Sequence, residues 1–414
     1  MAVIEAERVY KVFGRRPERG VQRLERGCSR DELARDGLTA AVIDATFEVS
    51  PGEIFVVMGL SGSGKSTLIR MVNGLLDCTS GQMRIEGRDI SSLDAAALRH
   101  VRREKVSMVF QHFALLPHRS VGENAAYGLK VRGLNRSDRE ARAAEALGMV
   151  GLQGWEDSLP GELSGGMRQR VGLARALAAD TPVLLMDEAF SALDPLIRRE
   201  MQDQLIELQA QLNKTILFIT HDLNEAMRLG DRIAMMRDGR IEQIGTAEQI
   251  LTDPANDYVS QFVQDVDRAR VLTAEQVMEP PVAVLGSEQG PLAAHRLMRK
   301  HQLDQLVVVD RERRIRGALD AGDVALAVED GRTGLDGLLQ PVGTVRAGTL
   351  LADVLHDAAA SPTLLAVVDD RSRLVGVLPA VLLLNVLGGA RPHSLGDLDE
   401  ALARQGSLVG GEAR

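Results

Sequence analysis

Short apolar runs alternate with amphipathic helical patterns through roughly the first 265 residues. The pattern at Pro195–Leu212 is typical of the helices, because its apolar residues recur at helical spacing and place one stripe toward a core. Asp194 suits the N-cap of this helix, and Pro195 is tolerated in its first turn. The alternation predicts an α/β fold with a largely parallel sheet. Five runs are expected to be its buried strands: Ile54–Met58, Val106–Phe110, Val183–Met186, Thr215–Thr220 and Ile233–Met236.

The remainder of the chain contains an internal repeat. Leu306–Asp310 is followed seven residues later by Gly317–Leu319, and Leu365–Asp369 is followed in the same way by Gly376–Leu378. Each unit reads as helix, strand, turn, strand and helix, and so short a unit buries its apolar face best against its twin. We expect a paired α+β module of two units and a flexible polar tail, at 277–332, 338–390 and 391–414.

Composition narrows the class of protein. Of the 414 residues, 45% are apolar and 26% charged, which is typical of globular chains. Cys28 and Cys78 are too few for a disulfide framework. A net charge of −9 and an aromatic content of 3% argue against a nucleic-acid partner. The longest apolar stretch, near Val377–Leu387, is shorter than the roughly 20 residues of a membrane helix. We therefore expect a soluble protein or one bound to a membrane component.

A glycine-rich phosphate-binding motif follows the first central run. Residues 59–67, Gly-Leu-Ser-Gly-Ser-Gly-Lys-Ser-Thr, match G-x-x-x-x-G-K-[ST] and open a helical segment at Leu68–Asn73. The glycines let backbone N–H groups point at phosphates. Lys65 is expected to reach the β- and γ-phosphates, and the Ser66 hydroxyl to coordinate Mg²⁺. The expected phosphate-binding residues are Gly59, Ser61, Gly62, Ser63, Gly64, Lys65, Ser66 and Thr67.

Two acids end the apolar run Val183–Met186. Asp187 and Glu188 would lie at the carboxyl end of a parallel strand, which faces the ligand crevice in such sheets. Asp187 suits the metal, through a water molecule, and Glu188 suits a general base that polarises an attacking water. The pattern is common by itself, but beside a phosphate loop it indicates nucleotide hydrolysis.

Residues 163–170, Leu-Ser-Gly-Gly-Met-Arg-Gln-Arg, lie between these motifs and resemble the signature of the ATP-binding-cassette (ABC) transporter ATPases, L-S-G-G-x-x-Q-R. The resemblance extends to Gln111 as the Q-loop glutamine, Ser191–Asp194 as the D-loop, His221 as the switch histidine and Phe13 as the aromatic that stacks on adenine. It implies a P-loop NTPase domain over residues 1–265, with a helical subdomain at about 112–163.

The resemblance also implies a mechanism. Ser164 and its glycines would lie at a helix N-terminus and cap the γ-phosphate held by a second protomer, so that a head-to-tail homodimer encloses two ATP molecules. It assigns Lys65, Glu188 and His221 to catalysis, and Ser66, Gln111 and Asp187 to Mg²⁺. It assigns to the nucleotide, besides the phosphate loop, Phe13, Gln111, Ser164, Gly165, Gly166, Gln169 and Asp194.

The layout as a whole resembles the ATPase subunit of glycine betaine/proline importers. The runs that carry this likeness are Glu53–Ser61, Met108–His118, Glu188–Ile197 and Asn256–Val259. The likeness implies a peripheral subunit at the cytoplasmic face of the inner (plasma) membrane, which powers osmolyte import through a permease served by an extracytoplasmic substrate-binding protein. The stretch between Gln111 and Ser164 would meet the permease.

Several alternatives to this function stay open. The cargo could also be choline, methionine or a polyamine, because other subunits of the transporter determine which cargo is bound. A non-transport ABC ATPase is less favoured, since those proteins usually carry two cassettes or a long coiled coil. A binding protein with an inactive ATPase is disfavoured by the intact Lys65, Asp187, Glu188 and His221.

The repeat resembles tandem CBS modules, which often bind adenylates through an aspartate in G-x-φ-[ST]-x-x-D. Gly317–Asp323 retains the acid as Asp323, whereas Gly376–Leu382 lacks it. The module is therefore expected to bind one adenylate or to regulate without a ligand. A third interpretation is an ionic-strength sensor, in which a basic patch binds anionic lipid until salt screens the attraction. That patch would comprise Arg296, Arg299, Lys300, Arg311, Arg313, Arg314 and Arg316.

An arginine-rich insertion, Arg15–Thr39, separates Gly14 from the next strand. In most ATPases of this kind that strand follows within a few residues. The charge pattern favours a solvated helix. The functional alternative is a clamp near the nucleotide or a membrane surface.

Overall fold

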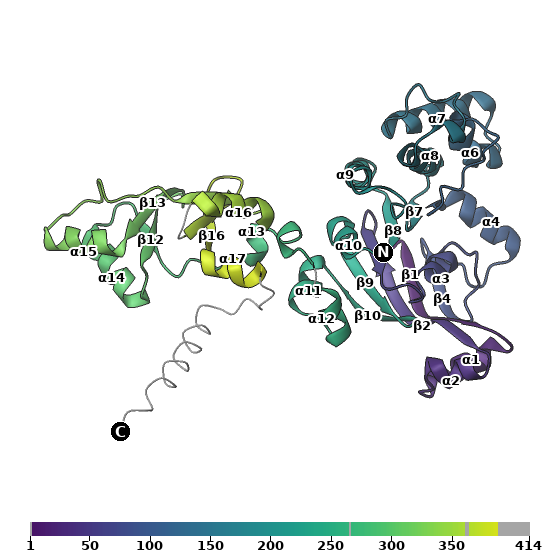
Figure 1. Ribbon diagram of the computed structural model, residues 1–414, viewed down its shortest axis with the longest axis horizontal. Helices are drawn as coiled ribbons and strands as arrows, with labels where there is room; N and C mark the ends of the chain where they lie inside the picture. The colour runs from purple at the N-terminus through teal and green to yellow at the C-terminus, as the bar shows by residue number, and fades with distance from the viewer. Residues whose placement is uncertain (1, 265, 361–363, 388–414) are drawn as a thin grey trace. The chain divides into compact units, whose positions relative to one another are not determined.

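The backbone is described for residues 2–264, 266–360 and 364–387 in the computed structural model (Figure 1). The chain divides into two units, Met1–Val263 and Gln264–Arg414. The expected flexible tail at 391–414 lies outside the described residues. Among the helices that are described, none combines the length and the apolar character needed to cross a bilayer.

The five predicted strands form the centre of one sheet in the first unit. They are β3 (Ile54–Met58), β6 (Val106–Val109), β7 (Val183–Asp187), β8 (Thr215–Thr220) and β9 (Arg232–Arg237). A sixth strand, β10 (Arg240–Gly245), completes the order β10-β9-β3-β8-β7-β6. β9, β3, β8, β7 and β6 are parallel and β10 is antiparallel to β9. The predicted α/β fold is therefore confirmed.

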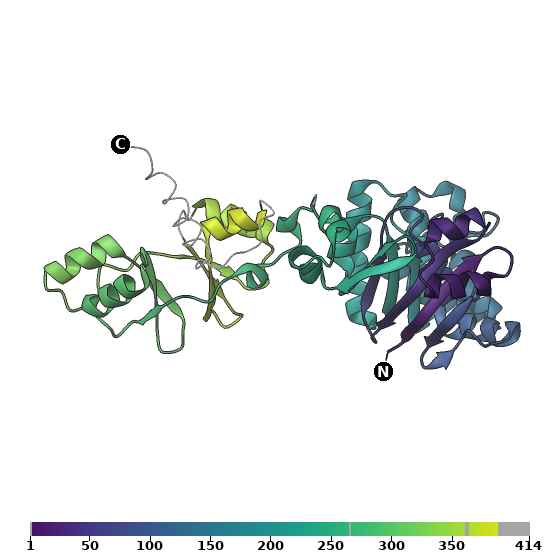
Figure 2. The same ribbon diagram turned by 90° about the horizontal axis from the view of Figure 1, so that it is seen from below.

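A smaller antiparallel sheet packs against the first. Its order is β2-β1-β4-β5, with β1 (Ile4–Phe13), β2 (Thr39–Val49), β4 (Ser80–Ile85) and β5 (Arg88–Asp89). Figure 2 shows its purple strands in front of the teal parallel sheet. Phe47 and Phe55 stack between the sheets, with ring centroids 5.4 Å apart. Helix α3 (Lys65–Val72) shares this core and buries Leu68 and Ile69 completely, so the helix that follows the phosphate loop is fixed.

A helical part follows β6 in the chain. It consists of α5 (Val121–Ala125), α6 (Tyr127–Val131), α7 (Arg136–Met149) and α8 (Gly165–Ala178), and Figure 1 shows α6, α7 and α8 grouped together. Asn135 caps α7, because its side chain accepts a hydrogen bond from the Asp138 amide. Further α-helices of this unit are α4 (Ala95–Glu104), α9 (Pro195–Leu212), α10 (Leu223–Leu229), α11 (Ala247–Thr252) and α12 (Asp257–Phe262).

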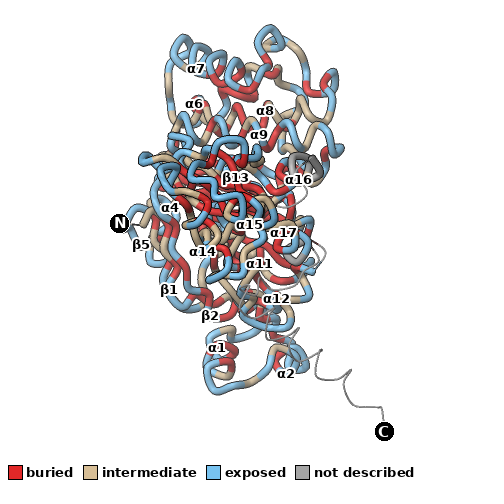
Figure 3. The backbone as a smooth tube through the Cα atoms, turned by 90° about the vertical axis from the view of Figure 1, so that its left-hand side faces the viewer, coloured by how far each residue is buried: buried red, intermediate tan, exposed pale blue. Residues whose placement is uncertain are grey.

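The insertion contains two short helices in place of the solvated helix that its charge pattern favours. They are α1 (Pro17–Glu25) and α2 (Arg30–Arg35). Each has a buried stretch, red in Figure 3, and Val21, Leu24 and Leu33 pack with residues of β1 and β2. The expectation missed this because three apolar residues are few among so many charges. The insertion is thus attached to the antiparallel sheet and is not a free solvated segment.

The second unit confirms the repeat. One half contains β11 (Val284–Gly286), β12 (Gln305–Val309) and β13 (Ile315–Asp320), and the other contains β14 (Gly343–Arg346), β15 (Leu364–Val368) and β16 (Leu374–Pro379). In each half the first pair is parallel and the second antiparallel. The pairs Val308–Gly317 and Val367–Gly376 are equivalent, so both hairpins have the same register.

The two halves bury apolar side chains against each other, as the length of the repeat predicts. Val307 and Val309 pack with Ala366, Leu374 and Val377. The Leu374 amide also donates to the Arg313 carbonyl at 2.9 Å. The α-helices among the described residues of this unit are α13 (Ala274–Val277), α14 (Pro291–His301), α15 (Ala321–Glu329), α16 (Leu351–Ala360) and α17 (Ala380–Leu387).

Candidate active site

The phosphate loop lies between β3 and α3, and its lysine is folded back on it. Lys65 begins α3, is 5% exposed, and donates from Nζ to the carbonyls of Gly59 at 2.8 Å and Leu60 at 3.1 Å. Burial lowers the pKa of Lys65, and the charges of Glu188 and Asp187 oppose this shift. A desolvated ammonium gains most from an anion, so this lysine is suited to phosphate oxygens.

Two glycines let the loop press against neighbouring strands. A Cβ atom on Gly59 would lie 2.1 Å from the Met236 carbonyl oxygen, and one on Gly64 would lie 2.2 Å from that of Ala41. Their φ angles are 154° and 106°, which side chains disfavour. Any other residue at these two positions would displace the loop.

The residues of the predicted metal site are in contact. Ser66 Oγ donates to Asp187 Oδ1 at 3.3 Å. Burial raises the pKa of Asp187, while the Ser66 hydrogen bond and nearby cations lower it. Hydroxyl and carboxylate oxygens suit Mg²⁺, which takes its other ligands from phosphates and water. Within the described ranges no group of three or more His, Cys, Asp or Glu forms a metal cage.

A second observation fits a nucleotide at this loop. Ser63 is 4% exposed, and its Oγ has no hydrogen-bond partner within the described part of the chain. Buried hydroxyls are normally satisfied, so an unpaired one is explained by a missing group. A phosphate oxygen would satisfy it.

Glu188 and His221, which are predicted for catalysis, lie together with Gln111, which is predicted for Mg²⁺ and the nucleotide, at the ends of three parallel strands. Glu188 Oε2 lies 3.0 Å from His221 Nδ1 and accepts from Gln111 Nε2 at 3.4 Å. Glu188 has a left-handed φ of 46°, and its amide donates to the Ile219 carbonyl at 3.0 Å. The Glu188 side chain is 17% exposed and that of His221 55% exposed, so a water molecule has access to the carboxylate.

The signature residues lie at a helix N-terminus. Ser164 caps α8 by accepting from the Met167 amide at 3.2 Å, and Gly165 and Gly166 form the first turn. Free N–H groups there attract anions. Among the contacts of the described residues, none joins this segment to the phosphate loop of the same chain.

Three other predicted residues have different surroundings. Phe13 ends β1 and is 40% exposed, and Lys11 Nζ lies over one face of its ring, 5.2 Å from the centroid. Asp194 caps α9 by accepting from the Ile197 amide at 3.1 Å. Gln169 is completely buried, and neither atom of its amide has a partner in the described ranges. In this structure its side chain cannot touch a nucleotide directly.

Sequence reasoning did not identify Arg198. Its guanidinium pairs with Asp222 at 3.3 Å and donates to the Leu193 carbonyl at 3.1 Å. It therefore ties Ser191–Asp194 to the residue that follows His221. Only the spatial arrangement of α9 and β8 brings these positions together, and no local motif contains both.

Comparison with known proteins identifies the family of the chain. The ABC transporter model matches residues 42–191, and the CBS domain model matches residues 274–330. The glycine betaine transport ATP-binding protein OpuAA of Bacillus subtilis is 46% identical over 387 residues, which are 93% of this chain and 92% of that protein. The chain belongs to the ABC transporter ATP-binding proteins. It is an ATP-hydrolysing subunit of a transporter.

Two further comparisons concern a second sequence relative and a solved structure. The glycine betaine/proline betaine transport system ATP-binding protein ProV of Escherichia coli is 45% identical over 389 residues, covering 93% of this chain and 97% of ProV. The cassette MJ0796, solved as a dimer in a post-hydrolysis state bound to ADP and Pi, is 30% identical with a TM-score of 0.50. The match covers 59% of this chain and 98% of the MJ0796 chain. The P-loop NTPase fold is thereby confirmed.

Proposed function

We propose that the chain powers the import of glycine betaine, or of a closely related quaternary amine, through a partner permease. The observation that carries this is the 46% identity to the OpuAA protein, which extends over 93% of the chain and so includes both units. We assign ATP hydrolysis to residues 1–265 and regulation to residues 277–332 and 338–390.

The test is the ATPase rate of the chain in complex with its permease and substrate-binding protein. Glycine betaine or proline betaine is expected to raise the rate. Choline, methionine and spermidine at the same concentration serve as comparisons. Stimulation by one of these three, and none by the betaines, would assign the cargo to another class.

In the proposed mechanism two copies associate head to tail. Lys65 and the loop amides bind the phosphates, and Glu188 orients and polarises the attacking water, with His221 and Gln111 fixing its carboxylate. Ser164 and its glycines of the second copy cap the γ-phosphate. Ser66, Asp187 and Gln111 would hold Mg²⁺, which neutralises charge on the phosphates when bound. The permease would be at the cytoplasmic face of the inner membrane, with an extracytoplasmic binding protein.

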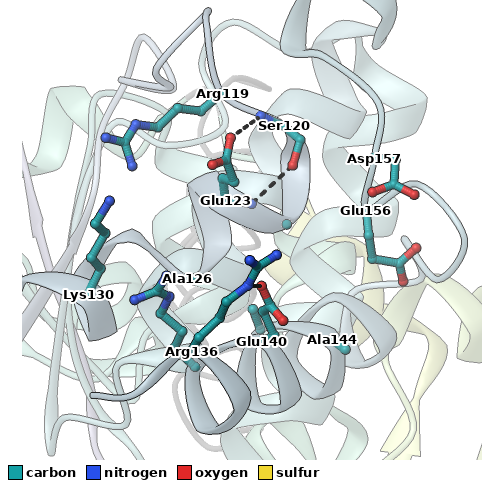
Figure 4. A pocket seen from close by; sticks show the side chains of 13 residues that line it. Arg119, Ser120, Glu123, Ala126, Lys130, Arg136, Glu140, Ala144, Glu156 and Asp157 are labelled. Atoms are coloured by element: carbon teal, nitrogen blue, oxygen red, sulfur yellow. Dashed lines mark hydrogen bonds and ion pairs between the residues drawn. The ribbon is translucent and has the colours of Figure 1, made fainter. Parts of the chain in front are cut away.

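A pocket in the helical part supports the proposal that this part of the chain contacts the permease. It has a volume of about 660 Å³, and basic and acidic side chains line it. Figure 4 shows Arg119 and Lys130 on one side and Glu156 and Asp157 on the other. Arg136 and Glu140 form an ion pair at 2.7 Å along its lower edge. We assign this pocket to a cytoplasmic helix of the permease, whose charges would match the two sides.

Arg139→Glu is expected to lower the rate of substrate uptake about tenfold, the factor that a loss of about 1.4 kcal/mol in coupling represents. Arg139 lines the pocket from α7, and reversing its charge would repel the partner. Basal ATP hydrolysis by the isolated chain is expected to stay unchanged. Arg142→Glu, one turn further along α7 and outside this pocket, is the matched control. Equal uptake by the two variants would exclude the pocket.

The arrangement of the expected basic patch favours one part of it as the ionic-strength sensor. Arg311 pairs with Glu288 at 2.7 Å, Arg314 pairs with Glu312 at 3.2 Å, and Arg313 donates to the Leu374 carbonyl at 3.4 Å. These three are engaged within the unit. Arg296, Arg299 and Lys300 are exposed along one face of α14, and no ion pair among the described residues involves them.

Replacing Arg296, Arg299 and Lys300 together by Glu is expected to abolish activation of uptake by internal salt in anionic liposomes. Each near-surface charge contributes about 1 kcal/mol to membrane binding, so three contribute roughly a 100-fold preference. Liposomes of neutral lipid are the control, where both proteins should respond alike. Unchanged salt activation would contradict the assignment.

An adenylate remains the second candidate ligand of this unit. Asp323 Oδ2 accepts from Gln340 Nε2 at 2.9 Å, and Oδ1 would be the oxygen that accepts from a ribose hydroxyl. Adenylate binding would be supported if AMP raised the Tm of Gln264–Arg414, measured in the full chain. The Lys65→Ala variant is used for this measurement because it removes the contribution of nucleotide binding by the cassette.

A further inference from the structure

One arginine of the insertion reaches the phosphate loop. Arg30 is the first residue of α2, directly after Ser29, which forms a capping box with Glu32. Arg30 Nη2 donates to the Gly62 carbonyl at 3.3 Å, and Nη1 pairs with Asp238 Oδ1 at 3.1 Å. The capping box fixes the residue at which α2 begins, and it therefore fixes the backbone position from which the Arg30 side chain extends.

The partner of Arg30 belongs to the turn between β9 and β10. Asp238 and Gly239 have φ angles of 49° and 85°, as in the tight turns that suit hairpins. The Gly239 amide donates to the Ser63 carbonyl at 2.9 Å, and its own carbonyl accepts from the Ile43 amide at 2.7 Å. Two successive carbonyls of the phosphate loop are thus bound from outside, one by Arg30 and one by this turn.

Holding a carbonyl also directs an amide. The Gly62 carbonyl and the Ser63 amide share one planar trans peptide, and so do the Ser63 carbonyl and the Gly64 amide. Within each peptide the two groups point in opposite directions. An outer contact to the oxygen therefore limits the rotation of the N–H group, and such groups form the phosphate cradle.

The tip of the loop is open on its outer side. A Cβ atom at Gly62 would meet nothing within 4 Å, whereas Gly59 and Gly64 lie against the carbonyls of Met236 and Ala41. The two ends of the loop pack closely against backbone, and within the loop the amide of the Gly62–Ser63 peptide donates to the Leu60 carbonyl at 3.2 Å. Arg30 supplies the contact to the carbonyl side of this peptide, from a segment 32 residues earlier in the chain.

We propose that Arg30 is a positioning residue for the phosphate loop: it holds the Gly62–Ser63 peptide and so increases the affinity for ATP without touching the nucleotide. The inserted helices α1 and α2 act as the clamp near the nucleotide, with Asp238 as the second anchor of the guanidinium. The inference depends on ATP binding by the loop and is independent of the cargo.

The experiment measures the Kd for a fluorescent ATP analogue, KM and kcat for ATP, and Tm. For Arg30→Ala we expect Kd and KM to rise about three- to tenfold, as the loss of one hydrogen bond to a polar loop does. The kcat at saturating ATP and the Tm should change little, since the pair with the 68%-exposed Asp238 is a surface ion pair.

Two further variants separate positioning from a structural role. Arg30→Lys can donate to one acceptor at a time and should restore part of the affinity, and Asp238→Asn should give an intermediate Kd; both remain informative if Arg30→Ala fails to fold. Arg26→Ala removes the same charge from an exposed site of the insertion and should keep the wild-type Kd. An unchanged Kd in Arg30→Ala, or a loss of kcat with KM unchanged, would overturn the proposal. Failure of the wild-type chain to bind ATP would instead refute the function of the loop.

Discussion

Glu188→Gln is expected to lower the rate of ATP hydrolysis about 10²–10⁴-fold while ATP still binds, because the amide cannot act as a general base. The variant keeps the shape of the side chain and can still contact Gln111 and His221, which lie 3.4 and 3.0 Å from Oε2. Single-turnover hydrolysis and nucleotide binding, measured on one preparation, check both statements.

The control for this variant is Glu207→Gln, which changes an exposed carboxylate on α9. It should hydrolyse ATP at the wild-type rate. Normal turnover by Glu188→Gln would show that another group polarises the water, and His221 would then be the next residue to examine. Loss of ATP binding would show that the carboxylate supports the fold of the site.

Lys65→Ala is expected to raise the Kd for ATP about 10- to 100-fold, since it removes a charged donor worth about 1.5–3 kcal/mol to a phosphate. Isothermal titration with ATP and Mg²⁺ checks this. Lys105→Ala, at the exposed lysine that pairs with Glu86, is the control and should bind normally.

The nucleotide-free Lys65→Ala protein should keep its Tm. Burial lowers the pKa of Lys65 in the folded state, so holding the charged ammonium costs stability at every pH below that lowered value. The cost falls as the pH rises above that lowered pKa and is gone above the pKa of Lys65 in the unfolded chain. A large fall in Tm at neutral pH would mean that Lys65 holds the loop together through Gly59 and Leu60, and binding data on this variant would then have a structural cause.

The sequence was sufficient for the parts of the site that depend on local pattern. The apolar runs before Gly59 and Asp187 end at the carboxyl edge of one sheet, so the phosphate loop and the acids were expected to face one crevice. The predicted bounds of these strands agree with the observed ones because a buried parallel strand is apolar on both faces and so appears as an uninterrupted apolar run. The repeat was visible because both hairpins keep the same spacing.

The parts that could not be predicted depend on contacts between distant residues. Arg30 and Asp238 are 208 positions apart, and no periodicity links them. The sheet order that brings β9 beside β3 is likewise absent from local pattern. Gln169 belongs to a motif that the family associates with the nucleotide, yet the packing of α8 buries it completely. Motif membership alone did not distinguish a residue that faces a ligand from one that faces the core.

The central claim is that ATP hydrolysis at Glu188 drives the uptake of a quaternary amine. The most direct measurement is the ATP-dependent accumulation of radiolabelled glycine betaine in proteoliposomes that contain the permease with either the wild-type chain or Glu188→Gln. The account predicts accumulation with the wild-type chain and ATP, and none with Glu188→Gln or without ATP. Equal accumulation with both proteins, or none with an actively hydrolysing wild-type complex, would contradict it.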